Sequence, residues 1–124
     1  MKSKTLTIRP TVATDLQQLN IETFGVSMRG RTIELDGKPL GVGGVLHQEM
    51  PQAFSTMSDE LRKYPKTIVK FITSFETMLK KHYTTVYAVA SSKEKNAAAC
   101  LTRAGFEYMN TDSNGQEVYR WQIQ

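Results

Sequence analysis

Short stretches of the chain alternate between apolar and polar residues, which is the period of a β-strand with one buried face. The first stretch, residues 6–10, ends at a proline, and a second covers 32–35. Asp36-Gly37 follows the second stretch, and residues 39–46 then form a further apolar run. An Asp-Gly pair favours a two-residue hairpin turn because both turn residues need a positive φ. The pattern therefore predicts a strand and a β-hairpin in the first half of the chain.

Later stretches predict further strands. Residues 52–57 form one, and residues 85–90 form another that is apolar throughout, as expected for a strand buried on both faces. A last hairpin is expected from 106–109 through Asn114-Gly115 to 117–123. Its second strand, near 117–122, is expected to expose a sheet edge at which a second copy of the chain could pair as a homodimer.

Three segments have the spacing or composition of helices. Thr14-Asp15 supply a start for a short helix, and Pro65 suits the first turn of a long amphipathic helix. The apolar face of the long helix contains Ile68, Phe71, Ile72, Phe75, Met78, Leu79 and His82. A shorter alanine-rich helix is expected to end at Gly105, and a polar connection over 58–64 has room for one helical turn.

The order of these elements predicts the fold class. A strand and a helix are followed by a hairpin, a strand, a helix, a strand, a helix and a final hairpin. A mixed central sheet with helices on both faces buries all of these apolar faces economically. We therefore expect an α/β (α+β) fold, with residues 1–124 forming a single domain.

Composition narrows the class of protein. The chain has 124 residues, 40% of them hydrophobic and 23% charged, which is ordinary for a globular domain. Its single cysteine, Cys100, excludes an intramolecular disulfide, and no apolar run approaches the length of a membrane span. We therefore expect a cytoplasmic protein without a membrane association. Two histidines and no clustered carboxylates argue against a metal site.

The net charge of +4 suits an anionic partner, although a solvated surface is the more usual explanation of a charge this small. Nucleic acid is an unlikely partner by this pattern, because the lysines are spread along the chain and do not alternate with aromatic residues. Gly41, Gly43 and Gly44 lie in a predicted strand and lack the spacing of a dinucleotide-binding loop. Glycines in a strand instead often mark a bulge or a close approach of another backbone.

The segment from Val86 to Phe106 carries the strongest family resemblance. It comprises an apolar strand, a polar turn, an alanine-rich helix and the pair Gly105-Phe106. Together with the opening Thr7-Ile8-Arg9-Pro10 and the order of elements, it resembles the GNAT acyltransferases over nearly the whole chain. The resemblance implies a GNAT-like domain that uses acetyl-CoA and acetylates an amine. It also implies that two parallel strands, 53–57 and 85–90, splay apart around the cofactor, so that the backbone of Ser55, Thr56 and Met57 pairs with pantetheine.

The same resemblance implies that the cofactor's pyrophosphate binds at the start of the long helix, on Arg62, Lys63, Lys66 and Thr67. The family pattern there has glycines where this chain has Pro65 and Thr67. Proline removes an N–H donor, so the three cationic side chains would have to compensate. The alternative is an ordinary solvated helix start.

The catalytic groups match the family less well. The family's general acid, a tyrosine four residues before the Gly-Phe pair, is replaced by Leu101, and Cys100 beside it is more typical of packing. Asn96 resembles a cofactor-contacting asparagine of the family, or it caps the helix. His47 and Glu49, just past the glycine-rich strand, are candidates for a catalytic base, with polar loop residues as the alternative.

A closer resemblance is to the short GNAT-like internal virion proteins of T7-like phages. It rests on residues 7–11, on 37–44 and on Ser55-Thr56-Met57-Ser58-Asp59 ahead of a basic helix start. It implies a role in virion morphogenesis through binding to a phage or host protein. The sequence thus leaves three functions open: an active N-acetyltransferase, a catalytically degenerate GNAT-fold protein that binds other proteins, and a small nucleic-acid-associated protein.

Overall fold

The computed structural model describes residues 6–23, 25–91 and 95–123. Its strands are β1 (Leu6–Pro10), β2 (Met28–Leu35), β3 (Lys38–Leu46), β4 (Gln52–Met57), β5 (Thr85–Ser91), β6 (Glu107–Thr111) and β7 (Gln116–Gln122). Its helices are α1 (Ala13–Gln18), the 3-10 turn η1 (Asp59–Lys63), α2 (Pro65–His82) and α3 (Lys95–Arg103). The strands form one mixed sheet in the order β1-β2-β3-β4-β5-β7-β6, in which only β4 and β5 are a parallel pair. The predicted fold class is confirmed.

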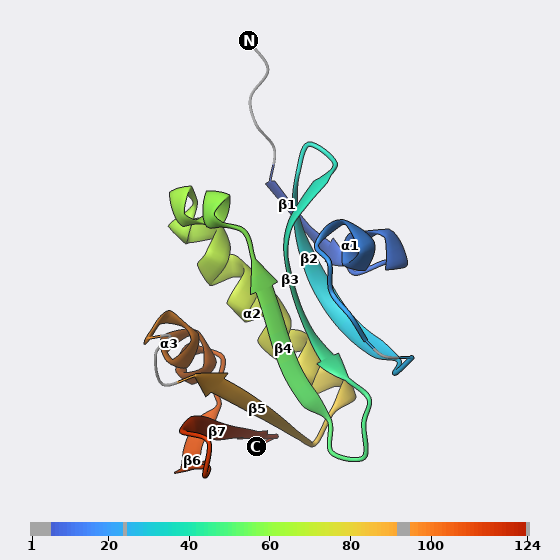
Figure 1. Ribbon diagram of the computed structural model, residues 1–124. Coiled ribbons are helices and arrows are strands. Elements are labelled where there is room, and N and C mark those ends of the chain that lie inside the picture. Colours follow the sequence, from blue (N-terminus) through green and yellow to red (C-terminus); the bar gives the residue numbers. More distant parts are fainter. Residues whose placement is uncertain (1–5, 24, 92–94, 124) are drawn as a thin grey trace.

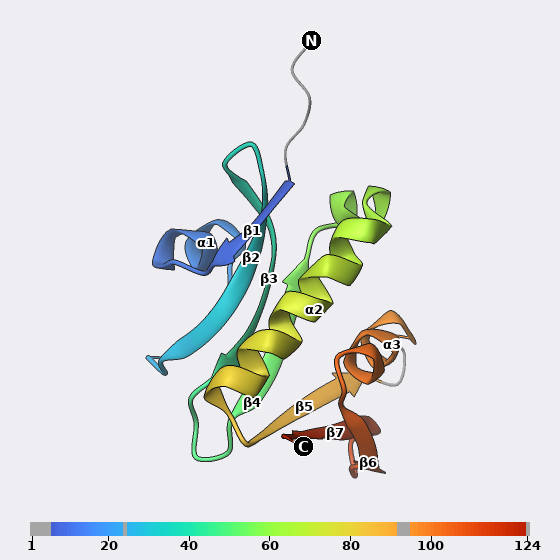
Figure 2. The same ribbon diagram turned by 180° about the vertical axis from the view of Figure 1, so that it is seen from behind.

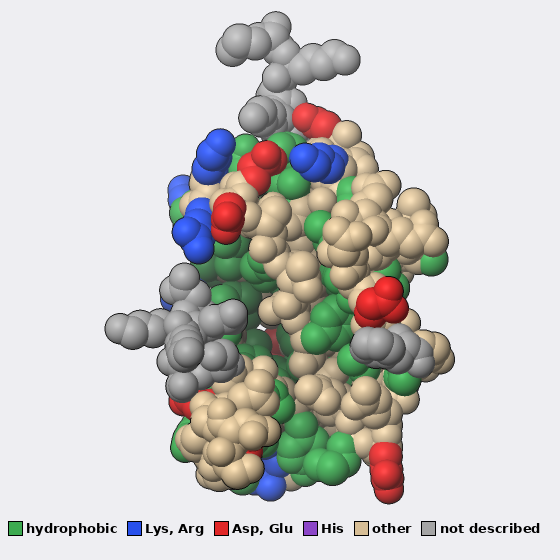
Figure 3. Space-filling model, viewed as in Figure 1, with side chains coloured by type: hydrophobic (Ala, Val, Ile, Leu, Met, Phe, Trp, Pro, Cys, Tyr) green, Lys and Arg blue, Asp and Glu red, His purple; other side chains and the backbone are tan. Residues whose placement is uncertain are grey.

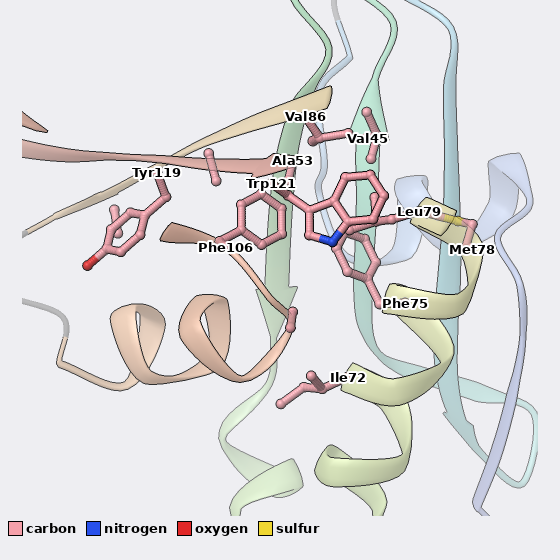
Figure 4. Close-up of a cluster of buried hydrophobic side chains, with 13 residues drawn as sticks. Val45, Ala53, Ile72, Phe75, Met78, Leu79, Val86, Phe106, Tyr119 and Trp121 are labelled. Atoms are coloured by element: carbon pink, nitrogen blue, oxygen red, sulfur yellow. The ribbon is translucent and has the colours of Figure 1, made fainter. Parts of the chain in front are cut away.

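Helices lie on both faces of the sheet, as predicted. Figures 1 and 2 show α1 on one face and α2 with α3 on the other. The larger core lies between the sheet and the second pair of helices, where Phe75 and Leu79 of α2 meet Phe106 and Trp121 (Figure 4). Each of these side chains is at least nine-tenths buried. His82 is exposed and so does not belong to the buried face of α2, contrary to the sequence pattern.

The hairpin between β2 and β3 forms as predicted. Asp36 and Gly37 have φ values of 49° and 89°, so both turn residues adopt the left-handed conformation that an Asp-Gly turn allows. Gly105 ends α3 in a similar way, with φ 98°. The N–H groups of Gly105 and Phe106 donate to the carbonyls of Thr102 and Leu101, which is the Schellman pattern of a helix end.

The glycines of β3 allow two helical elements to pack directly on the strand. A Cβ atom at Gly43 would lie 2.7 Å from Cζ of Phe71, and one at Gly41 would lie 2.8 Å from Cδ1 of Leu61. No real Cβ contact is that short. A close approach was expected from the glycine-rich sequence, but at Gly41 and Gly43 the nearest groups are side chains of η1 and α2 and not another backbone. This packing brings α2 and η1 against the middle of the sheet.

A buried carboxylate joins α1 to the first two strands. Asp15, 3% exposed, accepts hydrogen bonds from both terminal nitrogens of Arg9 at 2.8 Å and from Oγ1 of Thr32 at 3.0 Å. The N–H of Val12 donates to it as well, at 2.9 Å, which caps the first turn of α1. Nε of Arg9 lies 3.1 Å from Glu34. Asp15 is thus ionised in the folded chain, and both of its carboxylate oxygens accept hydrogen bonds.

This network predicts an acid-sensitive part of the stability. The hydrogen bonds from Arg9 lower the pKa of Asp15 from 3.8 to about 2. Because the folded-state pKa is lower, Asp15 stabilises the fold fully above pH 3.8 and loses that contribution as the pH falls towards 2. We expect the free energy of unfolding to fall by about 2 kcal/mol over this window through Asp15 alone. Urea unfolding of the wild type and of Asp15→Asn at several pH values measures it, and equal slopes in both proteins would contradict the assignment.

Two sequence-based expectations about the second half of the sheet are wrong. β5 is buried on one face only: Val86, Ala88 and Ala90 are buried, whereas Val89 is 40% exposed. The other face is exposed because no helix of the described residues covers it there. The apolar composition of β5 does not indicate this. β7 is also not an edge, since it pairs with β5 on one side and β6 on the other. The expected dimer edge near 117–122 is therefore interior, and the sheet ends at β1 and β6.

Candidate functional site

The two parallel strands separate soon after they meet. β4 and β5 are paired at only two positions, Gln52 with Tyr87 and Ala53 with Ala88. Beyond these pairs the strands diverge towards their C-terminal ends, and Figure 1 shows the opening between them as a V. The start of α2 follows β4, and α3 follows β5, so both helices begin beside the open end of the V.

The divergence leaves part of the β4 backbone facing the opening. The N–H of Tyr87 donates to the carbonyl of Pro51, whereas the N–H of Ser58 donates to Leu40 of β3. Backbone groups of a strand alternate in direction, so odd-numbered residues of β4 face β5 and even-numbered ones face β3. Ser55 and Met57 therefore direct their N–H and carbonyl groups into the V. Those of Thr56 face β3, and only its side chain, which is exposed, is available at the opening.

The loop between β4 and α2 is basic but has few free amides. Thr67 and Ile68 both donate their N–H groups to the carbonyl of Tyr64, and Pro65 has none to offer. Of residues 65–68, Lys66 keeps an N–H that is available to an anion, and a helix N-terminus favours anions. Its side chain and those of Arg62 and Lys63 are exposed. An anion at this helix start would therefore be held mainly by cationic side chains.

Acidic residues partly offset that charge. Arg62 lies 3.8 Å from Asp59, and the two side chains are 79% and 94% exposed. An ion pair this open to water contributes little and leaves Arg62 free to move. Blue and red side chains accordingly alternate at the upper left of Figure 3, over η1 and the start of α2.

The position on α3 at which a general acid is expected carries no proton donor that suits catalysis. Leu101 is half-buried against the core, and Cys100 packs beside it. Burial raises the pKa of the Cys100 thiol, so it stays protonated and unreactive. Asn96 is the second residue of α3, one position inside the helix and not in the capping position before it. Its side chain lies outside the described residues.

The two candidate bases, His47 and Glu49, have different environments. His47 receives contacts from both sides of its ring: Nδ1 lies 3.0 Å from Oγ of Ser27, and Nε2 lies 2.6 Å from the hydroxyl of Tyr83. One ring nitrogen therefore connects the end of β3 to the residue before β2, and the other connects it to the segment after α2. Glu49 has no such role and lines a hollow that begins at the paired ends of β4 and β5.

This hollow has a volume of about 380 Å³ and an apolar lining. It lies on the sheet face that carries α1, and its walls are Gln48, Glu49, Met50, Gln52, Tyr87, Val89 and Val118. The exposed side chains of Met50 and Val89 belong to it. The sequence pointed to Glu49 alone of this group. Gln48 and Met50 flank it in the same loop, and the remaining members come from β4, β5 and β7, which only the folded sheet brings together.

Two further expectations concern metals and membranes. Among residues 6–23, 25–91 and 95–123, no group of three or more His, Cys, Asp or Glu side chains is placed to hold a metal ion. Within the same residues, each helix is too short or too polar to cross a membrane.

Comparison with solved structures identifies the fold. A ribosomal-protein alanine N-acetyltransferase from Escherichia coli superposes with a TM-score of 0.75 at 14% identity, over 97% of this chain and 95% of that one. A GNAT-family acetyltransferase from Streptococcus pneumoniae gives 0.77 at 10% identity, over 97% and 100%. An aminoglycoside acetyltransferase in complex with coenzyme A and kanamycin gives 0.67 at 16% identity, over 97% and 95%. The chain thus has a GNAT fold from end to end.

No protein-family model matches the chain, and no curated protein does either. At identities of 10–16% the structural likeness establishes the fold alone. The residues that carry function have therefore to be argued from the geometry of this chain.

Proposed function

We propose that this chain binds acetyl-CoA in the V between β4 and β5 and transfers the acetyl group to an amine. The observation that carries the proposal is the separation of β4 from β5 after two residue pairs. Unpaired backbone groups at the edge of a strand bind an extended amide-bearing chain as another strand would. The pantetheine arm of coenzyme A is such a chain, and Ser55 and Met57 offer it two N–H and two carbonyl groups.

The phosphate end of the cofactor fits less well, and side chains take a larger share of its binding. Arg62, Lys63 and Lys66 stand beside the open end of the V and would pair with the pyrophosphate. Pro65 and Thr67 make the backbone contribution smaller than glycines would. Thr67 would add its hydroxyl, and Asn96 of α3 is the further candidate for a cofactor contact.

The chemistry requires a base near the thioester, and the candidate lies on the sheet face that carries α1. Glu49 lines the apolar hollow at the paired ends of β4 and β5, where an acceptor amine could meet the thioester. Glu49 would take the proton that the amine loses as its nitrogen bonds to the acyl carbon and the carbon–sulfur bond breaks. The leaving sulfur would take a proton from water, because Leu101 has none to give. His47 is less suited to this role, since Ser27 and Tyr83 already engage both of its nitrogens.

Removing one backbone N–H in the V should test the cofactor site. Ser55→Pro deletes an N–H that faces the opening and leaves the ladder between β3 and β4 intact. We expect the affinity for acetyl-CoA to fall about tenfold or more, as for the loss of one well-placed hydrogen bond. Isothermal titration calorimetry of the wild type and the variant measures the effect, and circular dichroism checks the fold.

Ser55→Ala is the matched control, because it keeps the N–H and removes only an exposed hydroxyl. Its affinity should equal that of the wild type. If acetyl-CoA bound both variants as tightly as the wild type, the cofactor would not lie along β4. If the wild type did not bind at millimolar acetyl-CoA, the proposed activity would be excluded.

A second candidate is favoured by Leu101 and Pro65, which stand where a proton donor and a glycine are expected. It is a GNAT-fold protein that has lost catalysis and acts by binding another protein. The finer form of this proposal, a virion protein of T7-like phages, has no support among the structural matches. If the protein bound acetyl-CoA but released no free coenzyme A thiol when a panel of amines and peptides was offered as acceptors, this candidate would be favoured over the transferase.

A further inference from the structure

A group of cationic side chains gathers on the α2 face of the sheet, at the C-terminal end of α2. Arg29 and Arg31 are two residues apart on β2, so their side chains point to the same face. Arg31 is paired with Gly43, whose missing side chain would point at Phe71 of α2. The two arginines therefore lie on the side of α2, as Figure 2 shows for the strand and the helix.

The last turn of α2 adds further positive charge. Lys81 and His82 end the helix. Partial desolvation, followed by the charges of Arg29, Lys81 and Arg31, lowers the pKa of His82, so all four groups lie within electrostatic reach. The ion pairs found among the described residues use Arg9 and Arg62 and none of these cations.

One donor in this group is buried without an acceptor. Nε of Arg31 is shielded from water and has no hydrogen-bond partner in the described part of the chain. An unpaired buried donor lowers stability, more so for a charged group, and native structures usually satisfy it. A small turn of the Arg31 side chain would let a bound anion supply that acceptor. The anion would also relieve the repulsion among Arg29, Arg31 and Lys81, whereas the lowered pKa leaves His82 a neutral donor at pH 7.

The hydroxyl of Tyr83, 2.6 Å from Nε2 of His47, is a further polar group next to the cations. The ring of Tyr83 has centroid separations of 5.8 Å from His47 and 6.5 Å from His82. The charge of Arg29 also acts on Tyr83. Arginine, histidine and hydroxyl donors around an uncompensated positive charge are the groups that bind phosphate oxygens.

We propose that Arg29, Arg31, Lys81 and His82 form a binding site for a phosphate group. Side chains two residues apart on a strand are about 7 Å apart, so two guanidinium groups can contact one tetrahedral oxyanion from two sides. The phosphate would come either from a small phosphate monoester or from a nucleic-acid backbone. Since α2 has 18 residues and spans about 27 Å, this site lies at the opposite end of the helix from Arg62 and Lys66.

Titration with inorganic phosphate at low salt tests the proposal. The Nε–H signal of Arg31 in a nitrogen-15 correlation spectrum should shift as phosphate is added. In the double variant Arg29→Gln/Lys81→Gln, which changes two exposed side chains, phosphate affinity should fall about tenfold or more. The double variant Arg62→Gln/Lys66→Gln removes the same charge at the other end of α2. The affinity read from the Arg31 signal, which reports this site and not the pyrophosphate site, should then change less than about twofold.

An unchanged Arg31 signal would overturn the proposal, and so would equal losses of affinity in the two double variants. A single-stranded oligonucleotide without terminal phosphates then distinguishes the two sources. Salt-dependent binding that the Arg29→Gln/Lys81→Gln variant loses would assign the site to a nucleic-acid backbone. Phosphate binding without oligonucleotide binding would assign it to a phosphate monoester. Either result is independent of whether acetyl-CoA binds in the V.

Discussion

Replacing Arg62 and Lys66 together by glutamate is expected to abolish acetyl-CoA binding and to leave the fold intact. Both side chains are exposed and contribute nothing to the core, so the double variant should unfold like the wild type. At the start of α2 they are the main source of positive charge for a pyrophosphate, because Pro65 and the Tyr64 carbonyl leave few free N–H groups there. We expect the affinity to fall at least about a hundredfold, since two attractions become two repulsions.

Calorimetric titration of acetyl-CoA into the double variant measures this loss. Lys80→Glu/Lys81→Glu is the matched control, because it makes the same change in net charge in the last turn of the same helix. A long-range effect of net charge would weaken binding equally in both. Full affinity in Arg62→Glu/Lys66→Glu would place the pyrophosphate elsewhere, whereas loss only in this variant would support the proposed site.

Gly43→Val should strongly destabilise the fold, even though valine is a better strand former than glycine. The new Cβ would lie 2.7 Å from Cζ of Phe71, and the methyl groups would approach Phe75 as well. Relieving the overlap requires the buried Phe71 ring to leave its position or α2 to move away from the sheet. We expect a loss of about 3 kcal/mol in the free energy of unfolding, measured by urea denaturation.

A double-mutant cycle with Phe71→Ala separates this clash from a general effect on β3. Phe71→Ala alone should cost about 3–5 kcal/mol, because it leaves a cavity under α2. In the double variant the valine side chain fills part of that cavity, so the combined loss should be clearly smaller than the sum. Additive losses would mean that Gly43 acts through the strand itself and not through its contact with the helix.

The sequence predicted most of the fold because its signals are local. Asp36-Gly37 predicts a turn from two adjacent residues, Pro65 and the apolar spacing after it predict a helix, and Gly105 predicts a helix end. Each was confirmed in the structure. A close approach to the glycine-rich strand was also expected, although helix side chains and not another backbone make it.

What could not be predicted depends on residues that are distant in sequence. Asp15 looked like a helix start, yet its strongest partner is Arg9, and Thr32 reaches it from the second strand. The exposed face of β5 arises from what the helices leave uncovered, which the composition of the strand does not state. The same holds for the hollow beside Glu49, which is lined by a loop and three strands, and for the cations around Arg31, which come from β2 and α2.

Because β4 and β5 are paired over so short a length, the molecule also consists of two parts that are weakly joined through the sheet. Strands β1 to β4 with α1 form one part and strands β5 to β7 with α3 form the other, and the sheet joins them by two residue pairs. Helix α2 lies against both parts: Phe71 packs in the smaller core of the first part, and Phe75, Met78 and Leu79 pack in the larger core, which contains residues of both. Local opening can therefore begin in one part without unfolding the other. A molecule held between the arms would close this hinge and make the two parts unfold as one cooperative unit.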